Sequence, residues 1–130
     1  MKAIDTNVVV RFILRDDEAQ AAVTDRVLEH PCFLSLTVLL ECVWLLSSRF
    51  ELSRPAISAS LREVLSLSTI STVDDKLVHW AIRRFELGAD FADMVHMIDG
   101  RLADGFLTFD RRLAKQAGKS PPLAIETLQA

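Results

Sequence analysis

Four acidic residues stand at positions where this sequence is otherwise apolar. Asp5 and Asp110 each end an apolar run, Glu41 is the only charged residue between positions 31 and 49, and Asp93 opens a helical segment. A buried carboxylate without a partner costs several kcal/mol, and none of the four has a Lys or Arg at helical spacing on an evident buried face. Carboxylates gathered in one place would repel one another and require a cation. We therefore interpret them as ligands of a divalent metal, with hydrolysis of a phosphodiester as the leading chemistry.

The segments that must position these acids alternate between short apolar strands and helices. The sequence predicts strands over 1–6, 32–36, 69–73, 105–109 and 123–125. It predicts helices over 7–15, 17–29, 37–50, 53–65, 90–104 and 111–117, and a further helix that begins at 74 or 75 and ends at 87. Thr37 and Asp90 are expected to cap two of these helices. The alternation predicts an α/β fold: one domain spanning 1–130, with a parallel sheet of about five short strands and helices on both faces.

Ligand sites in such sheets lie at the carboxyl ends of the strands. Asp5 and Asp110 follow strands, while Glu41 and Asp93 lie early in helices that begin at the same edge, so all four can reach one rim. Each acid alone also has a simpler explanation. Asp5 and Asp110 suit turns or helix caps, Asp93 suits the third position of a capping box begun by Asp90, and Glu41 suits a narrow exposed stripe.

Composition narrows the class of protein. The chain has 130 residues and a net charge of −3, and the four candidate acids account for more than this excess. A mean hydropathy of +0.24 is high for a small domain, and we expect a dimer that covers part of the helix 37–50 with Ile57 and Leu61. The sequence predicts no membrane span and no signal peptide. Two cysteines indicate a reducing cytoplasm rather than a disulfide framework.

The order of these residues along the whole chain resembles the PIN domain, and it looks most like the VapC-type toxins of bacterial toxin–antitoxin pairs. The motifs that carry the resemblance are Asp5-Thr6-Asn7, Glu41 in an apolar helix, Asp90-Phe91-Ala92-Asp93, and Thr108-Phe109-Asp110. The resemblance implies a metal-dependent ribonuclease, usually a homodimer, that a cognate antitoxin peptide silences. It implies Asp5, Glu41, Asp93 and Asp110 as the acidic residues, with Asn7 and Thr108 as supporting polar residues.

One position departs from the pattern of the family. Members often have a further Asp or Asn two residues after the last aspartate, where this chain has Arg112. The site then has one ligand fewer, so the sequence leaves open whether one metal or two are bound.

We interpret the chain as a Mg²⁺- or Mn²⁺-dependent endoribonuclease that uses a metal-activated water. Asp5, Asp93 and Asp110 are the expected ligands, and Glu41 would bind the metal or orient the water. The basic residues expected to contact RNA are Arg111, Arg112 and Lys115 after the last acid, and Arg11 and Arg15 after the first.

Two alternatives remain open. A Mg²⁺-dependent phosphatase would need a second acid at position 7, which is Asn. A non-catalytic α/β domain could bind a metal or a partner without turnover. The sequence also leaves open which RNA is cut, whether an antitoxin exists, and the oligomeric state.

Overall fold

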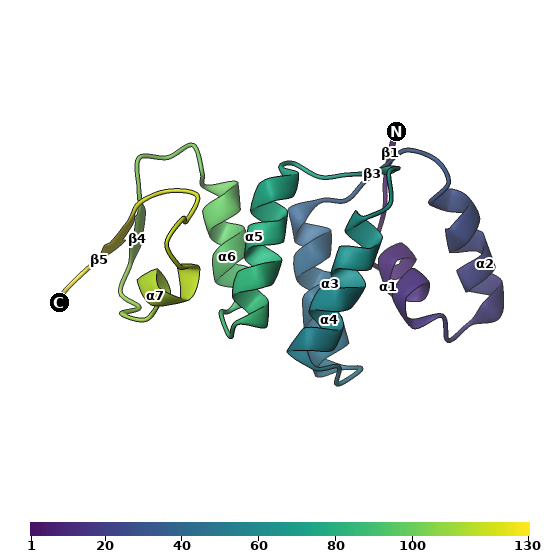
Figure 1. Cartoon of the computed structure of the whole chain (residues 1–130), viewed down its shortest axis with the longest axis horizontal. Coiled ribbons are helices and arrows are strands. Elements are labelled where there is room, and N and C mark those ends of the chain that lie inside the picture. Colours follow the sequence, from purple (N-terminus) through teal and green to yellow (C-terminus); the bar gives the residue numbers. More distant parts are fainter. The chain divides into compact units, whose positions relative to one another are not determined.

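The computed structural model describes residues 1–130 and divides them into two compact units, the N-terminal unit Met1–Asp75 and the C-terminal unit Lys76–Ala130. The N-terminal unit contains β1 (Lys2–Ala3), α1 (Thr6–Leu14), α2 (Glu18–Val27), β2 (Cys32–Phe33), α3 (Leu36–Ser48), α4 (Arg54–Leu65) and β3 (Ile70–Ser71) (Figure 1). The C-terminal unit contains α5 (Asp75–Glu86, whose first residue is the boundary), α6 (Phe91–Asp99), β4 (Phe106–Thr108), α7 (Leu113–Ala117) and β5 (Ile125–Thr127).

A three-stranded parallel sheet organises the N-terminal unit, in the order β1-β2-β3. Lys2 pairs with Cys32, and Cys32 pairs in turn with Ile70. The Ile4 N–H extends the ladder by donating to the carbonyl of Phe33 at 3.1 Å. Because the strands are parallel, their carboxyl ends share one edge, and helices α1 and α3 begin there (Figure 1).

Side-chain caps set where these helices begin. Asp5 caps α1 and Ser53 caps α4. Ser35 caps α3, where its Oγ accepts a hydrogen bond from the Val38 N–H at 3.2 Å. The prediction that Thr37 caps this helix was therefore wrong by two residues, because the polar side chain that reaches the free N–H groups belongs to Ser35.

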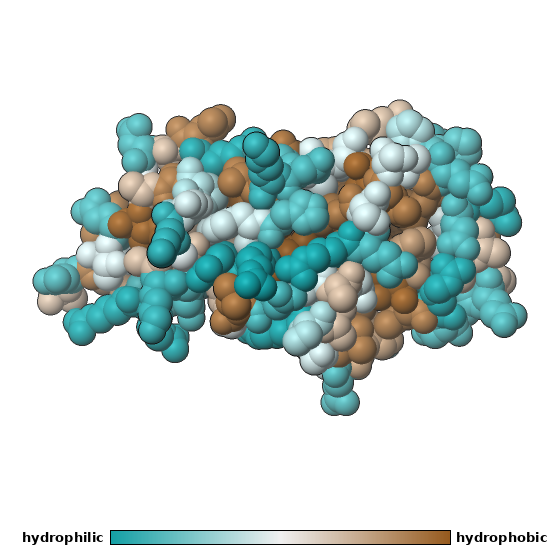
Figure 2. Space-filling model, viewed as in Figure 1, coloured by the Kyte–Doolittle hydropathy of each residue, from teal (hydrophilic) through white to brown (hydrophobic).

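The core of the N-terminal unit is formed by buried apolar side chains of α1, α3 and α4, among them Val9, Leu39 and Leu46. Ile57 and Leu61 are also buried, so the expectation that they offer surface to a second subunit was wrong. The apolar side chain that α3 leaves in solvent is Trp44, which is 64% exposed. By contrast, the surface over α2, at the right of Figure 2, is largely hydrophilic.

In the C-terminal unit, β4 pairs with β5 in parallel, with Phe106 opposite Ile125. The rings of Phe85 and Phe91 pack edge to face at 5.8 Å and join α5 to α6. Helix α6 ends at Asp99, five residues before the predicted end at 104. Gly100 follows it, and glycine is a poor helix former.

The prediction of a mixed α/β fold with parallel strands is confirmed, because every ladder is parallel and seven helices alternate with five strands. The strands are two or three residues long, shorter than predicted. The ladders form a three-stranded and a two-stranded sheet, one in each unit. A single domain over 1–130 stays a prediction. None of the helices combines the length and apolar character that crossing a membrane requires.

Candidate functional site

Asp5 is the residue at which β1 passes into α1. Its backbone is extended, with φ −83° and ψ 163°, and its Oδ1 accepts a hydrogen bond from the Thr6 N–H at 2.8 Å. This is the capping role that a turn residue at this position would have. The side chain is nevertheless exposed, so its second oxygen is accessible to a ligand.

Glu41 lies in the second turn of α3 and is exposed. The expectation that this carboxylate is buried in an all-apolar helix was wrong. The exposed positions Thr37, Glu41 and Trp44 follow one another at helical spacing, so they form a single stripe along α3. The apolar residues beside them, such as Leu39 and Cys42, form the buried side of the helix.

Cys42 shows that the two acids of the N-terminal unit share one neighbourhood. The pKa of its thiol is raised to about 12, first by burial and then by the negative charges of Glu41 and Asp5. Both carboxylates must therefore lie close enough to act on the same sulfur atom. The shared carboxyl edge of β1 and β2 accounts for this, because Asp5 follows β1 and α3 follows β2.

Asp93 lies in the first turn of α6 and is half-buried. Its backbone N–H donates to Oδ1 of Asp90 at 3.2 Å, so Asp90 is the cap that the sequence predicts. The pKa of Asp93 is raised, mainly by burial and next by the charge of Asp90, with Asp110 adding a further increase. The charge of His96 acts in the opposite direction.

Asp110 follows β4 and is also half-buried. Its N–H donates to Oγ1 of Thr108 at 3.0 Å, and its Oδ1 accepts from the Arg112 N–H at 2.9 Å. The guanidinium of Arg112 approaches that oxygen to 3.7 Å from a largely exposed side chain. An exposed ion pair of this kind is weak. Arg112 therefore leaves the carboxylate accessible from solvent.

The four predicted acids thus form one pair in each unit. Asp5 and Glu41 act together on Cys42, while the charge of Asp110 acts on Asp93. Asp5 and Glu41 are exposed, and Asp93 and Asp110 are half-buried. Within either unit, no group of three or more His, Cys, Asp or Glu residues is arranged to hold a metal. A single site that contains all four stays a prediction.

Among known families, the model for the PIN domain matches residues 2–119, a range that includes all four acids. The chain belongs to the PIN-domain family. PIN domains are in general nucleases that act on RNA or DNA and typically use divalent metals. No curated protein matches the chain. The VapC-type subfamily stays a prediction.

The acids of this PIN domain have the chemistry that a hard divalent cation requires. Every candidate ligand is a carboxylate oxygen, the donor that Mg²⁺ and Mn²⁺ prefer. No Lys or Arg pairs with Asp93, and its pKa is raised first by burial and then by the charges of Asp90 and Asp110. A cation bound there would relieve this repulsion, so the donor chemistry of these residues suits a divalent metal.

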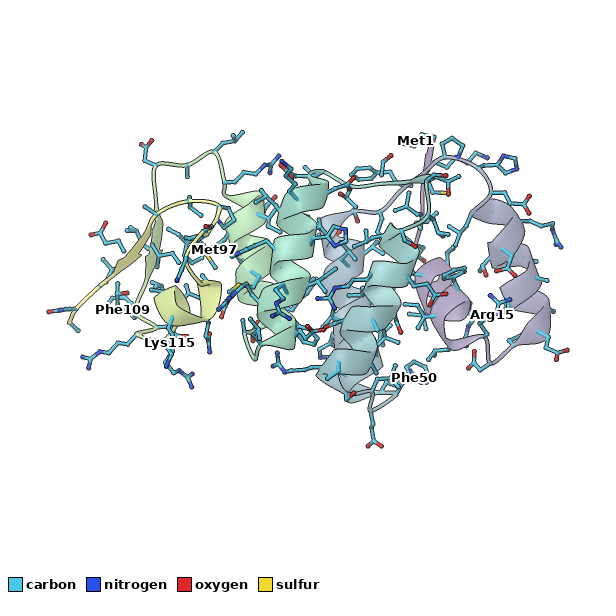
Figure 3. All side chains as sticks on the ribbon, viewed as in Figure 1. Met1, Arg15, Phe50, Met97, Phe109 and Lys115 are labelled. Carbon is cyan, nitrogen blue, oxygen red and sulfur yellow. The ribbon has the colours of Figure 1, made fainter.

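The basic residues predicted to bind RNA differ in what they contact. Arg11 donates to both carboxylate oxygens of Asp16, at 2.7 and 3.0 Å. Arg15 makes a bidentate pair with Asp25 at 2.9 and 2.8 Å, across the space between α1 and α2 (Figure 3). Their charges are therefore largely offset within the protein. Arg111, just before α7, and Lys115, on α7, are exposed and have no such partner, so they are better placed to contact phosphate.

The supporting residues also differ. Thr108 contacts Asp110 directly, as described above. Asn7 is exposed on α1, where it lines a hollow of about 340 Å³ with Arg11 and Arg49. The electrostatic role of Asp90 was not predicted, because this residue was expected only to cap α6. The spacing Asp90-x-x-Asp93 would have indicated it, because cap and third residue always lie close together.

Proposed function

We propose that this PIN domain is a Mg²⁺- or Mn²⁺-dependent endoribonuclease and the toxin of a toxin–antitoxin pair. The observation that carries the proposal is the family match, which extends over all four acids and therefore over both units. The two free, buried cysteines suit a reducing cytoplasm.

Asp5, Asp93 and Asp110 would hold the cation, and Glu41 would hold it or orient the attacking water. A bound divalent cation would lower the pKa of a water and offset charge on the leaving oxygen. Thr108 keeps Asp110 in position through its hydrogen bond to the Asp110 N–H. Glu41 is exposed and can accept a proton from water without breaking a structural contact. Asn7, one turn before Arg11, is available to contact substrate.

Arg111 and Lys115 would contact the backbone phosphates of the RNA, with Arg112 moving away from Asp110 to join them. Arg11 and Arg15 remain in the proposal with a smaller role, since each is already paired with an aspartate. Exposed basic groups of this kind supply binding energy that is independent of base sequence and falls as salt rises.

Cleavage of structured RNA tests the proposal. Purified protein should cut RNA with Mg²⁺ or Mn²⁺ and lose the activity in EDTA. Asp5→Asn and Asp93→Asn should each reduce the rate at least about 100-fold, because each removes a metal ligand. Asp99→Asn is the matched control, since Asp99 is an exposed acid on the same helix as Asp93. Undiminished cleavage in EDTA, or by both ligand variants, would contradict the metal mechanism.

The same preparation separates the alternatives. A phosphatase would release phosphate from p-nitrophenyl phosphate and leave internal RNA bonds intact. A non-catalytic domain would bind Mn²⁺ without turning over either substrate. Cleavage within an RNA whose two ends are blocked excludes both.

We also propose a homodimer that a cognate antitoxin recognises. Trp44 supports this, because a tryptophan that is 64% exposed on a helix is a large apolar surface in need of a cover. It lies one turn after Glu41 on the same exposed stripe. Light scattering should give twice the chain mass at micromolar concentration, and Trp44→Gln should lower the measured mass. A monomeric wild type contradicts the dimer.

The cognate antitoxin should inhibit the cleavage of RNA at nanomolar concentration.

A further inference from the structure

A hollow of about 530 Å³ lies in the C-terminal unit, and neither Asp93 nor Asp110 lines it. It is formed by one face of α5 and by the chain that leaves α7. Its lining combines an indole ring with three basic side chains and is contributed by Trp80, Arg83, Arg84, Ala117, Gly118, Lys119 and Ser120. Trp80, Arg83 and Arg84 share a side of α5 because they lie three and four residues apart.

The indole of Trp80 is held in a fixed position. Its Nε1–H donates to the carbonyl of Ala117 at 3.1 Å, and the side chain is half-buried. The single polar atom of the ring is thereby satisfied within the protein, while part of the ring borders the hollow. A pre-positioned aromatic surface loses little conformational entropy when a second flat ring stacks on it.

Arg84 is fixed just as firmly, but by carbonyls rather than carboxylates. Its Nε donates to the carbonyl of Gln116 at 2.6 Å and its Nη2 to that of Lys115 at 3.3 Å. The charge of Arg84 is therefore not cancelled. Arg83, by contrast, pairs with Glu86 at 2.8 Å. Lys119 is exposed and makes no ion pair, so the hollow retains two available positive charges.

Gly118 allows the guanidinium to come this close to the backbone. Its φ is +81°, and a Cβ added there would lie 2.7 Å from Nη1 of Arg84. Glycine at this position therefore determines both the turn after α7 and the place of the cation.

The basic residues after Asp110 connect the acidic pair to this hollow within one unit. They begin with Arg111 and Arg112, continue with Lys115 on α7, and reach Lys119 at the hollow. Figure 3 shows Lys115 extending from α7 into open space. Helix α7 has five residues, so it is only about 7.5 Å long. An RNA strand that leaves the acidic pair along these basic residues therefore leads toward the hollow.

We propose that this hollow binds a nucleotide of single-stranded RNA, with its base stacked on Trp80 and its phosphate held by Lys119 and Arg84. The proposal rests on the nuclease function proposed above. Stacking on a fixed aromatic ring beside cations is how proteins hold single-stranded nucleic acid without reading its sequence. A double helix would offer phosphates but no free base face, so the indole favours the single strand.

Binding measured in EDTA tests the proposal without cleavage. The probe is a fluorescein-labelled, unstructured RNA of 12 nucleotides, followed by anisotropy. Lys119→Gln should weaken binding about threefold to tenfold and lower the slope of log K against log salt by about 0.7, the value for one phosphate contact to a single strand. Lys76→Gln is the matched control, because Lys76 is an exposed lysine on α5 outside the hollow, and it should bind like wild type.

Substitutions of Trp80 separate stacking from a structural role. Trp80→Leu should weaken binding about tenfold, whereas Trp80→Phe should retain most of it, because phenylalanine still offers a ring. Both variants lose the hydrogen bond to Ala117, so a merely structural role predicts equal losses. Trp80 is the only tryptophan in a Trp44→Phe background, and this substitution changes no residue of the hollow. RNA should quench the fluorescence of Trp80 in that variant.

The outcomes distinguish this proposal from the nuclease function. Unchanged binding by Lys119→Gln and Trp80→Leu, in a protein that cleaves RNA, overturns the hollow alone. Weakened binding by these variants, in a protein that never cleaves RNA with Mn²⁺, supports the hollow and overturns the nuclease. Quenching of Trp80 by poly-glutamate but not by RNA would assign the hollow to an acidic peptide and contradict the proposal.

Discussion

Asp90 and Asp93 are joined by a hydrogen bond of 3.2 Å from the Asp93 N–H to Oδ1 of Asp90. The cap that begins α6 therefore also holds two carboxylates side by side. The cap stabilises the helix, and the negative charge of Asp90 makes ionisation of Asp93 less favourable. One contact thus stabilises the helix and makes ionisation of Asp93 less favourable.

This relationship determines how stability should depend on pH when metal is absent. The pKa of Asp93 is raised above its ordinary 3.8 by burial and by Asp90 and Asp110. The folded state then holds the proton more tightly than the unfolded state. The destabilisation is absent at low pH and appears as pH rises through the unfolded and then the folded pKa. Asp93→Asn should therefore raise the melting temperature in EDTA at pH 7 but not at pH 3.

A purely capping role for Asp93 predicts the opposite result. An acid in the first turn interacts favourably with the helix dipole, so its loss would lower the melting temperature at pH 7. Thermal melts at pH 7 and pH 3 distinguish this capping role from the raised pKa of Asp93, with Asp99→Asn as the control on the same helix.

Metal should stabilise the protein by mass action. At about 100 times its dissociation constant, Mn²⁺ should raise the free energy of unfolding by about 2.7 kcal/mol, because it binds the folded state alone. Asp93→Asn and Asp5→Asn should show much smaller increases, while Asp99→Asn should behave like wild type. The measurement is a melt with and without Mn²⁺. An unchanged wild-type melting temperature would show that these acids do not form a metal site.

Gly118→Ala should lower the free energy of unfolding by about 1–2 kcal/mol, since alanine is strained at a φ of +81°. The new Cβ would also displace the guanidinium of Arg84 and break its bonds to two carbonyls. Gly105→Ala is the matched control, because a Cβ there meets only an ordinary contact of 3.5 Å. Denaturant unfolding measures both.

A double-substitution cycle tests the cause of that loss. If the clash with Arg84 contributes, Gly118→Ala should cost less in an Arg84→Ala background than in wild type. Equal costs in the two backgrounds would leave backbone strain as the whole explanation.

Cys42 should react with iodoacetamide very slowly in the folded protein. Its side chain is fully buried and its pKa is raised to about 12, so very little of the thiol is both ionised and accessible at pH 8. Glu41→Gln should speed the reaction, because it removes one of the charges that disfavour the thiolate. Glu18→Gln on α2 should not. Rates are measured in a Cys32→Ala background by mass spectrometry. Equal rates for Glu41→Gln and wild type would contradict the closeness of Glu41 to the sulfur.

Much of the local structure could be predicted from the sequence alone. Polar caps and glycines mark helix ends, and short apolar runs mark strands, because these signals act over only a few residues. Asp90 was predicted as a cap and is one. Thr37 was also predicted as a cap, but Ser35 caps the helix instead. Ser35 lies two residues earlier and offers the same chemistry, and the sequence alone does not rank the two.

The environment of each candidate residue was decided by tertiary structure. Glu41 lies in a helix that is apolar on nearly every side, yet the packing of Leu39 and Cys42 inward leaves it in solvent. The helical spacing of Ile57 and Leu61 is the same for a helix that packs on its own core and for one that packs on a partner. In the folded chain both side chains are buried. Helical periodicity shows which residues share a face but not what that face meets.

Electrostatic partners depend on the same long-range placement. Arg15 is bound by Asp25, ten residues later, because α2 folds back beside α1. Nothing within a turn of Arg15 indicates this pair. The suitability of these carboxylates for a hard cation could be predicted from residue type alone, since hard cations prefer oxygen ligands. Burial, the largest cause of the raised pKa of Asp93, and the carbonyl partners of Arg84 arise only when segments distant in sequence pack together.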